Sequence, residues 1–202
     1  SKTMQRLWLA FAGVLVVSFA ILGWIGTRIY QEMPPLSIRV ETTDGQLIID
    51  AEEIAKGQNV WQTLGGMEVG SVWGHGSYVA PDWTADWLHR EAVFVLDEWA
   101  RAEYGKAYAE LDLEDQSRLR GRLEKVFRTN THDASTGVVR LDPVRKRAFE
   151  SLAAHYADVF SNGNTNYSIP RGAVTDSARL RQLAAFFFWT SWAASTNRPG
   201  DD

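Results

Sequence analysis

The residues most able to do chemistry lie in a glycine- and tryptophan-rich stretch, residues 57–87 (GQNVWQTLGGMEVGSVWGHGSYVAPDWTADW). Met67 and His75 lie in it, and a histidine–methionine pair can ligate a haem iron. In the alternative interpretation, His75 hydrogen-bonds the loop backbone and Met67 fills a gap in the packing. The chain has no cysteine, which excludes a c-type haem attached through Cys-x-x-Cys-His. A structural role for His75 and Met67 is therefore favoured over haem ligation.

Two polar groups lie at the end of this stretch or just after it. Residues 82–84 (Asp-Trp-Thr) could form a polar site, but their place before a long apolar-periodic run favours a helix cap. Residues 89–91 (His-Arg-Glu) could relay protons, but we expect them on a solvated helix face. Neither group predicts a catalytic residue in this chain.

Helical periodicity predicts the elements that must position these residues. The predicted helices cover about residues 51–64, 81–104, 114–127, 143–160 and 176–195. Asp50 with Glu53 forms a capping-box pattern for the first of them, and Asp142-Pro143 is a strong start signal for the fourth. The glycines exclude a regular helix over residues 65–80.

Two segments have patterns typical of β-structure. SIRVETTDGQLIID (37–50) predicts a β-hairpin around Asp44-Gly45. THDASTGVVRL (131–141) predicts a turn and one short strand. The fold class is therefore mainly α, with one small hairpin.

An aromatic run, FFFWTSW (186–192), closes the last predicted helix. Its apolar stretch is too short to cross a bilayer. A core helix, an aromatic helix at a membrane surface and a continuation into further protein all stay open at this point.

The N-terminal segment predicts a membrane anchor. Residues 7–29 carry no charge before Arg28, and a helix of that length spans about 34 Å, enough for a hydrocarbon core of about 30 Å. A cleaved signal peptide is the rival interpretation, but its apolar core would be shorter and would end in a small-residue site. We expect an anchor over residues 1–32 and a domain over residues 33–202.

Charge places limits on the partners. Lys2 and Arg6 precede the apolar run, so the positive-inside rule puts the N-terminus in the cytoplasm and the domain outside. The chain beyond residue 30 carries 18 basic and 25 acidic residues. This acidic balance argues against nucleic acid and against electrostatic docking on anionic lipid.

Two long blocks carry a family resemblance. Residues 57–92 and the ending FFFWTSWAASTNRPGDD (186–202) resemble the N-terminal region of quinol-dependent nitric oxide reductases. The resemblance extends over essentially the whole chain, from the anchor and the Met33-Pro34-Pro35 break onward. It implies a cytochrome-c-like helical domain, without haem, on a transmembrane helix.

The resemblance also implies what the complete enzyme does. Members of that family fuse such a domain to a helical bundle that holds haem b, haem b₃ and a non-haem iron. They reduce two molecules of nitric oxide to nitrous oxide and water, with two electrons from quinol and two protons. No bundle helix is in these residues, so catalytic residues and redox cofactors are expected elsewhere. The implied location is the bacterial cytoplasmic membrane with the domain on the periplasmic side.

The glycine-rich loop corresponds to the haem site of the related cytochrome c subunit. Gly65–Val69 stands where that subunit has Cys-x-x-Cys-His, and no cysteine is present. The side chains expected to pack the loop at the lost haem site are Met67, Trp73, His75 and Trp83. An empty cavity of that size would be very costly, so bulky apolar side chains should fill it.

The resemblance adds one metal and several partners. Backbone carbonyls of Gly76 and Tyr78 correspond to positions that help to hold calcium, and backbone oxygen suits that ion. The implied partners are the catalytic transmembrane bundle, membrane lipid and quinol, with homodimerisation left open. An alternative function is a membrane-anchored extracytoplasmic binding or sensor module, which ligand binding to the tryptophan-rich loop would favour.

Overall fold

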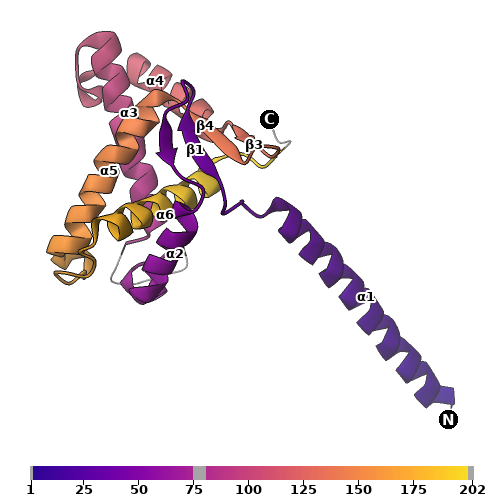
Figure 1. Cartoon of the computed structure of the whole chain (residues 1–202). Coiled ribbons are helices and arrows are strands. Elements are labelled where there is room, and N and C mark those ends of the chain that lie inside the picture. Colours follow the sequence, from indigo (N-terminus) through magenta and orange to yellow (C-terminus); the bar gives the residue numbers. More distant parts are fainter. Residues whose placement is uncertain (1, 75–80, 200–202) are drawn as a thin grey trace. The chain divides into compact units, whose positions relative to one another are not determined.

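The computed structural model describes residues 2–74 and 81–199. The chain divides into two compact units, residues 1–35 and residues 36–202. Most elements are helices (Figure 1). The α-helices are α1 (Lys2–Glu32), α2 (Glu53–Thr63), α3 (Trp83–Tyr104), α4 (Leu113–Arg128), α5 (Pro143–Asn162) and α6 (Ser177–Ser195). Short 3₁₀ helices are η1 (Gly66–Val69), η2 (Tyr108–Glu110) and η3 (Thr165–Tyr167).

The first unit is one continuous helix, α1, of 31 residues. It is the only helix among the described residues that is long and apolar enough to cross a membrane. None of its residues is buried within the chain. The helix ends at Glu32, just before the predicted Met33-Pro34-Pro35 break, because proline disfavours the helical conformation of the residue that precedes it.

The second unit contains a four-stranded sheet of β1 (Arg39–Thr42), β2 (Leu47–Ile49), β3 (His132–Asp133) and β4 (Val138–Leu141), in the order β2-β1-β4-β3. The predicted hairpin is confirmed as the antiparallel pair β1–β2. The strand predicted in residues 131–141 is confirmed as β4, which pairs with β1 in parallel, with Val40 opposite Val139. The short strand β3, antiparallel to β4, was not predicted. Alternate residues Val40 and Thr42 are buried, as expected for a sheet with one face on the core.

Helix α6 lies at the centre of this unit. Figure 1 shows it crossing the domain beside α2, α3 and α5, and its most extensive contacts are with α2. The two backbones approach so closely that a Cβ at Gly57 would lie 1.9 Å from the carbonyl oxygen of Gln182. Residues 183–193 are all buried. Within this unit, the aromatic run is therefore a core helix.

The helix caps follow the sequence signals. The side chains of Asp82, Asp112, Asp142 and Asp176 each accept a hydrogen bond from a first-turn N–H, at 2.8–2.9 Å. Gly105 ends α3 in the left-handed conformation, with φ of 68°. The predicted ends of α3, α4 and α5 lie within two residues of those observed.

Helix α2 begins later than predicted. Its first residue is Glu53 rather than Ala51, because residues 51 and 52 form a turn. The Glu53 carboxylate accepts from the backbone N–H of Asp50 at 2.9 Å, which is half of the predicted capping box. The Asp50 carboxylate instead accepts from the next residue, Ala51, at 2.8 Å, so the other half does not form.

Candidate functional site

Asp82 organises the described part of the glycine-rich loop. One of its oxygens caps α3 through the N–H of Ala85, and the other accepts from Ser71 Oγ at 2.9 Å and from the N–H of Gly74 at 2.6 Å. The backbones of Ser71 and Trp83 are also joined, at 2.8 Å. The predicted helix cap is therefore confirmed, and the same carboxylate also closes the loop.

The loop lies directly on the core. Gly70 has φ of 130°, a conformation that L-residues rarely adopt. A Cβ there would lie 2.3 Å from Nε1 of Trp83 and 2.8 Å from the carbonyl oxygen of Pro81. Glycine is thus required at this position both by the backbone conformation and by the close approach of the indole ring.

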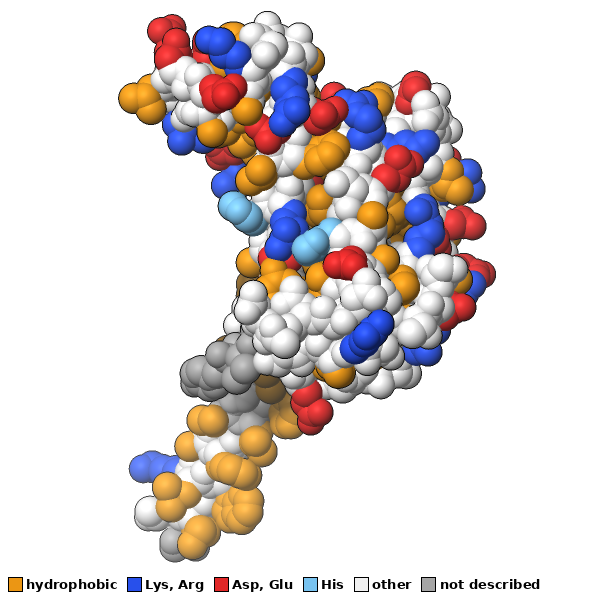
Figure 2. Space-filling view, turned by 90° about the vertical axis from the view of Figure 1, so that its left-hand side faces the viewer, with side chains coloured by type: hydrophobic (Ala, Val, Ile, Leu, Met, Phe, Trp, Pro, Cys, Tyr) orange, Lys and Arg blue, Asp and Glu red, His pale blue; other side chains and the backbone are white. Residues whose placement is uncertain are grey.

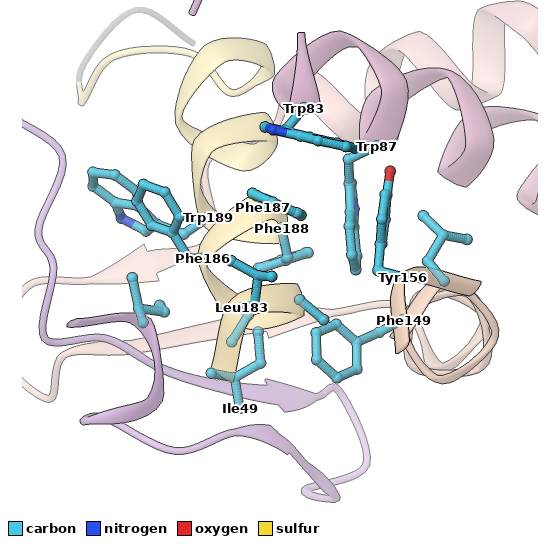
Figure 3. Close-up of a cluster of buried hydrophobic side chains, with 14 of the residues drawn as sticks. Ile49, Trp83, Trp87, Phe149, Tyr156, Leu183, Phe186, Phe187, Phe188 and Trp189 are labelled. Carbon is cyan, nitrogen blue, oxygen red and sulfur yellow. The ribbon is translucent and has the colours of Figure 1, made fainter. Parts of the chain in front are cut away.

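Beneath the loop, Trp83 and Trp87 are fully buried. Figure 3 shows their rings among the aromatic side chains of α5 and α6. Trp83 stacks on Phe187 with ring centroids 5.1 Å apart and an interplanar angle of 11°. Trp87 stacks in the same way on Tyr156, at 5.5 Å and 11°. The described residues below the loop therefore pack ring against ring.

The other described loop residues lie nearer the surface. Trp73 is 44% exposed, although its ring lies 5.3 Å from that of Trp189 and its Nε1 donates to the carbonyl oxygen of Thr190 at 2.9 Å. Met67, on η1, is 37% exposed. Of the predicted packing residues that the structure describes, Trp83 alone lies wholly in the core.

Three of the predicted site residues lie outside the described residues. They are His75, predicted to pack the loop, and Gly76 and Tyr78, the predicted calcium-binding positions. Among residues 2–74 and 81–199, no group of three or more His, Cys, Asp or Glu side chains is placed to hold a metal ion.

The prediction of a solvated 89–91 face was wrong for Glu91, which is 1% exposed. Its carboxylate pairs with Nε of Arg145 on α5 at 2.7 Å and accepts from Nε1 of Trp87 at 3.0 Å. The true buried face of α3 includes Trp87, Glu91 and Val95, a regular four-residue spacing. That spacing was the available signal.

A second polar cluster joins α3, α5 and η3. Asp86 accepts from the hydroxyls of Tyr156 at 2.7 Å and Tyr167 at 3.3 Å, and it pairs with Nε of Arg90 at 2.9 Å. Burial raises the pKa of Tyr156 well above its ordinary value, and the neighbouring Asp86 carboxylate acts in the same direction. This tyrosine is held protonated, and the cluster ties α3 to α5 and η3.

An open groove of about 500 Å³ lies on the outer side of α3 and α5. His89, Val93 and His155 are among the residues that line it. Burial, with the nearby charge of Arg90, lowers the pKa of His155. Ser151 also lines the groove, and Nε2 of His155 has no hydrogen-bond partner among the described residues.

The comparison with protein families decides the identity. Residues 37–202 match the family described as the NorB cytochrome c-like domain of nitric oxide reductase. The chain belongs to this family. The match covers the whole second unit apart from its first residue. No curated protein matches the chain.

Membership makes the chain part of a nitric oxide reductase, which is an oxidoreductase. The resemblance predicted from the two sequence blocks is confirmed at this level. The mainly helical fold with one long apolar N-terminal helix and a small sheet is confirmed as well. The helix α1 is consistent with a membrane-anchored protein.

Proposed function

We propose that this chain is the N-terminal part of a quinol-oxidising nitric oxide reductase. Its domain carries no redox centre of its own. The domain covers and supports the catalytic bundle, while electrons pass from membrane quinol to the bundle without crossing the domain. The observation that carries this proposal is the packing around Trp83, which is fully buried in a core of stacked rings.

This packing bears on whether the described residues fit a c-type haem. Such a group needs a pair of cysteines for attachment, and the chain has none. It also needs an apolar pocket beside its attachment loop. Beneath that loop, in this chain, Trp83 lies 5.3 Å from the ring of Phe160 and 5.8 Å from that of Tyr167, in addition to its stack on Phe187. The described residues do not fit the group.

The proposed arrangement in the membrane follows from α1. With Lys2 and Arg6 at its start, the N-terminus would lie in the cytoplasm and the domain on the periplasmic side of the bacterial cytoplasmic membrane. Lipid, quinol and the catalytic bundle are the proposed partners, and homodimerisation is compatible with the proposal. Haem b, haem b₃ and non-haem iron would belong to the bundle.

Calcium is the one metal proposed to touch this chain. Backbone carbonyls of Gly76 and Tyr78 would supply two of its oxygen ligands, and the bundle would supply the rest. The loop from Gly74 to Trp83 would then cover the bundle. Calcium removal from the purified enzyme should therefore loosen the loop, which protease susceptibility near residues 75–80 would report.

The donor test uses the complex purified from native membranes through a tag on this chain. Nitric oxide consumption is measured with a reduced quinol analogue and, separately, with reduced cytochrome c. The proposal predicts turnover with quinol and none with cytochrome c. Turnover with cytochrome c alone would overturn it, and so would a preparation that lacks haem b altogether.

A further inference from the structure

A small, comparatively enclosed hollow lies where the end of α4 meets the turn between β4 and α5. Its volume is about 250 Å³. The residues that line it come from four places in the chain: Thr43, Lys125, Val126, Thr129, Thr131, Arg140, Leu141, Asp142 and Arg145. Three of these are cations and one is an acid, on a chain whose net charge is −4. Figure 2 shows acidic and basic side chains intermixed on the face that it draws.

Arg145 gives the hollow a buried cation with unused donors. The side chain is 2% exposed, and its Nε is held by Glu91 at 2.7 Å. Its guanidinium group lies over the ring of Phe127, 4.4 Å from the centroid. Among the described residues, no acceptor pairs with its two terminal nitrogens. These terminal nitrogens are not among the fully buried side-chain atoms that lack a partner. They therefore reach the hollow, where they can donate to water or to a ligand.

The other two cations are exposed and unpaired. Lys125 and Arg140 form no ion pair with any described residue. A lysine in the last turn of a helix is stabilised by the helix dipole. The dipole therefore accounts for a Lys125 without an ion-pair partner, but not for Arg140, which lines the same hollow. The one acid, Asp142, is committed to the cap of α5 through Val144 at 2.9 Å. Since Glu91 balances Arg145, the hollow keeps an excess of positive charge.

Two of the three threonine hydroxyl groups in the lining narrow the choice of anion. Thr129 Oγ1 donates to the carbonyl oxygen of Lys125 at 2.8 Å, and Thr131 Oγ1 donates to that of Arg140 at 2.6 Å. Each hydroxyl hydrogen is therefore used, and both oxygens are left only as acceptors. An anion that also carries an O–H group can use them. Hydrogen phosphate and phosphate monoesters have one, and sulfate at neutral pH has none.

We propose that this hollow binds hydrogen phosphate or the phosphate group of a monoester. The cations Arg145, Lys125 and Arg140 bind its charged oxygens, and Thr129 and Thr131 accept from its O–H group. The phosphate could be a free soluble anion or a monoester headgroup such as that of phosphatidic acid. This site is independent of the proposed role in nitric oxide reduction.

The test is isothermal titration calorimetry on the full chain in a non-ionic detergent, at fixed ionic strength. Inorganic phosphate should bind, and sulfate should bind about tenfold more weakly because it lacks the donor. Binding of sulfate as tight as that of phosphate, or no binding of phosphate, would overturn the proposal. Dihexanoyl phosphatidic acid, titrated below its micelle concentration, distinguishes the sources: tighter binding than phosphate indicates a lipid headgroup, and equal or weaker binding indicates a soluble anion.

Two double variants make the test specific. Lys125→Gln with Arg140→Gln removes both exposed cations and should weaken phosphate binding by about tenfold. Lys106→Gln with Arg171→Gln changes the net charge equally, and neither of these exposed residues lines the hollow; this control should bind as the wild type does. An equal loss of phosphate binding in both double variants would mean that phosphate is attracted by the overall charge of the chain. That result would overturn the assignment.

Discussion

Two hydrophobic clusters of the domain show how differently parts of one chain can be held together. The first, here called the aromatic core, lies beneath the glycine-rich loop and includes Trp83, Trp87, Tyr156 and the 186–189 run. The second, here called the outer cluster, joins the C-terminal half of α3 to η2, α4 and α5. Its buried members are Val95, Leu96, Trp99, Ala100, Leu111, Leu119, Val144 and Ala148.

The aromatic core is stabilised by ring packing with almost no exposed surface. The outer cluster has one tryptophan, Trp99, whose face is covered by the guanidinium of Arg122 at 4.0 Å. Around it, Glu103 pairs with Arg118 at 2.8 Å and with Arg122 at 2.5 Å, at partly exposed positions. Exposed ion pairs contribute little, because water and salt screen them.

Large rings are concentrated in the aromatic core, and the outer cluster is packed mostly by aliphatic side chains. The substitutions below test this difference, beginning with the largest expected effect.

The strongest test is Trp83→Ala in the aromatic core. Loss of a fully buried ring should lower the free energy of unfolding by about 3–5 kcal/mol. Chemical unfolding of the full chain in detergent, followed by far-UV circular dichroism, measures it. The matched change is Trp99→Ala in the outer cluster, where the ring is covered by the mobile side chain of Arg122 rather than by other rings, and the loss should be smaller. An equal loss at the two positions would contradict the contrast.

Between the two clusters, Glu91→Gln should lower the free energy of unfolding by about 3 kcal/mol, because the amide leaves the Arg145 charge buried and uncompensated. The same unfolding measurement applies. Glu98→Gln is the control, because it breaks a more exposed α3–α5 pair, with Arg147 at 3.0 Å. A cost at Glu91 no larger than at Glu98 would show that the buried pair is not required.

Glycine substitutions sharpen the comparison of backbone positions. Gly70→Ala should lower the free energy of unfolding by about 1–3 kcal/mol, since it combines an unfavourable φ with a clash against Trp83. Gly105→Ala also has a positive φ, but open space surrounds its Cβ position. It should therefore show the backbone cost alone. If Gly105→Ala proves the more damaging change, the close packing of the loop on the core is wrong.

The smallest effect is expected at Glu103. The hydrogen bond from Arg118 lowers the pKa of this carboxyl below its usual value of 4.5. A lowered folded-state pKa means that the contribution is present above the unfolded pKa and is lost as pH falls through the folded one. Glu103→Gln should therefore change the midpoint of thermal unfolding slightly at pH 7 and not at all in strong acid. A large change at pH 7 would show that these ion pairs stabilise the outer cluster.

Local signals predicted most of the helices. These signals are Asp82 and Asp142 as caps, Gly105 at the end of α3 and the proline break after α1. Each acts within a few residues of the helix end that it sets, so a single sequence is enough to show it. The family could also be recognised, because its two motif blocks are long.

Non-local features could not be predicted in the same way. The pairing of β1 with β4 joins segments about 100 residues apart, and no short-range pattern requires it. Glu91 was misplaced because a charged residue on a helix is usually exposed, and only its partner on α5 shows otherwise. The phosphate hollow was missed for a similar reason, since four separate segments line it.

The most direct test of the central claim is a visible absorption spectrum of this chain expressed in a haem-rich bacterial host and purified in detergent. The account predicts no Soret band, with a far-UV spectrum of a folded helical protein, because the interior beneath the loop is filled by aromatic rings. A Soret band that persists through purification and disappears in a Met67 or His75 variant would contradict it. The domain would then be a haem protein.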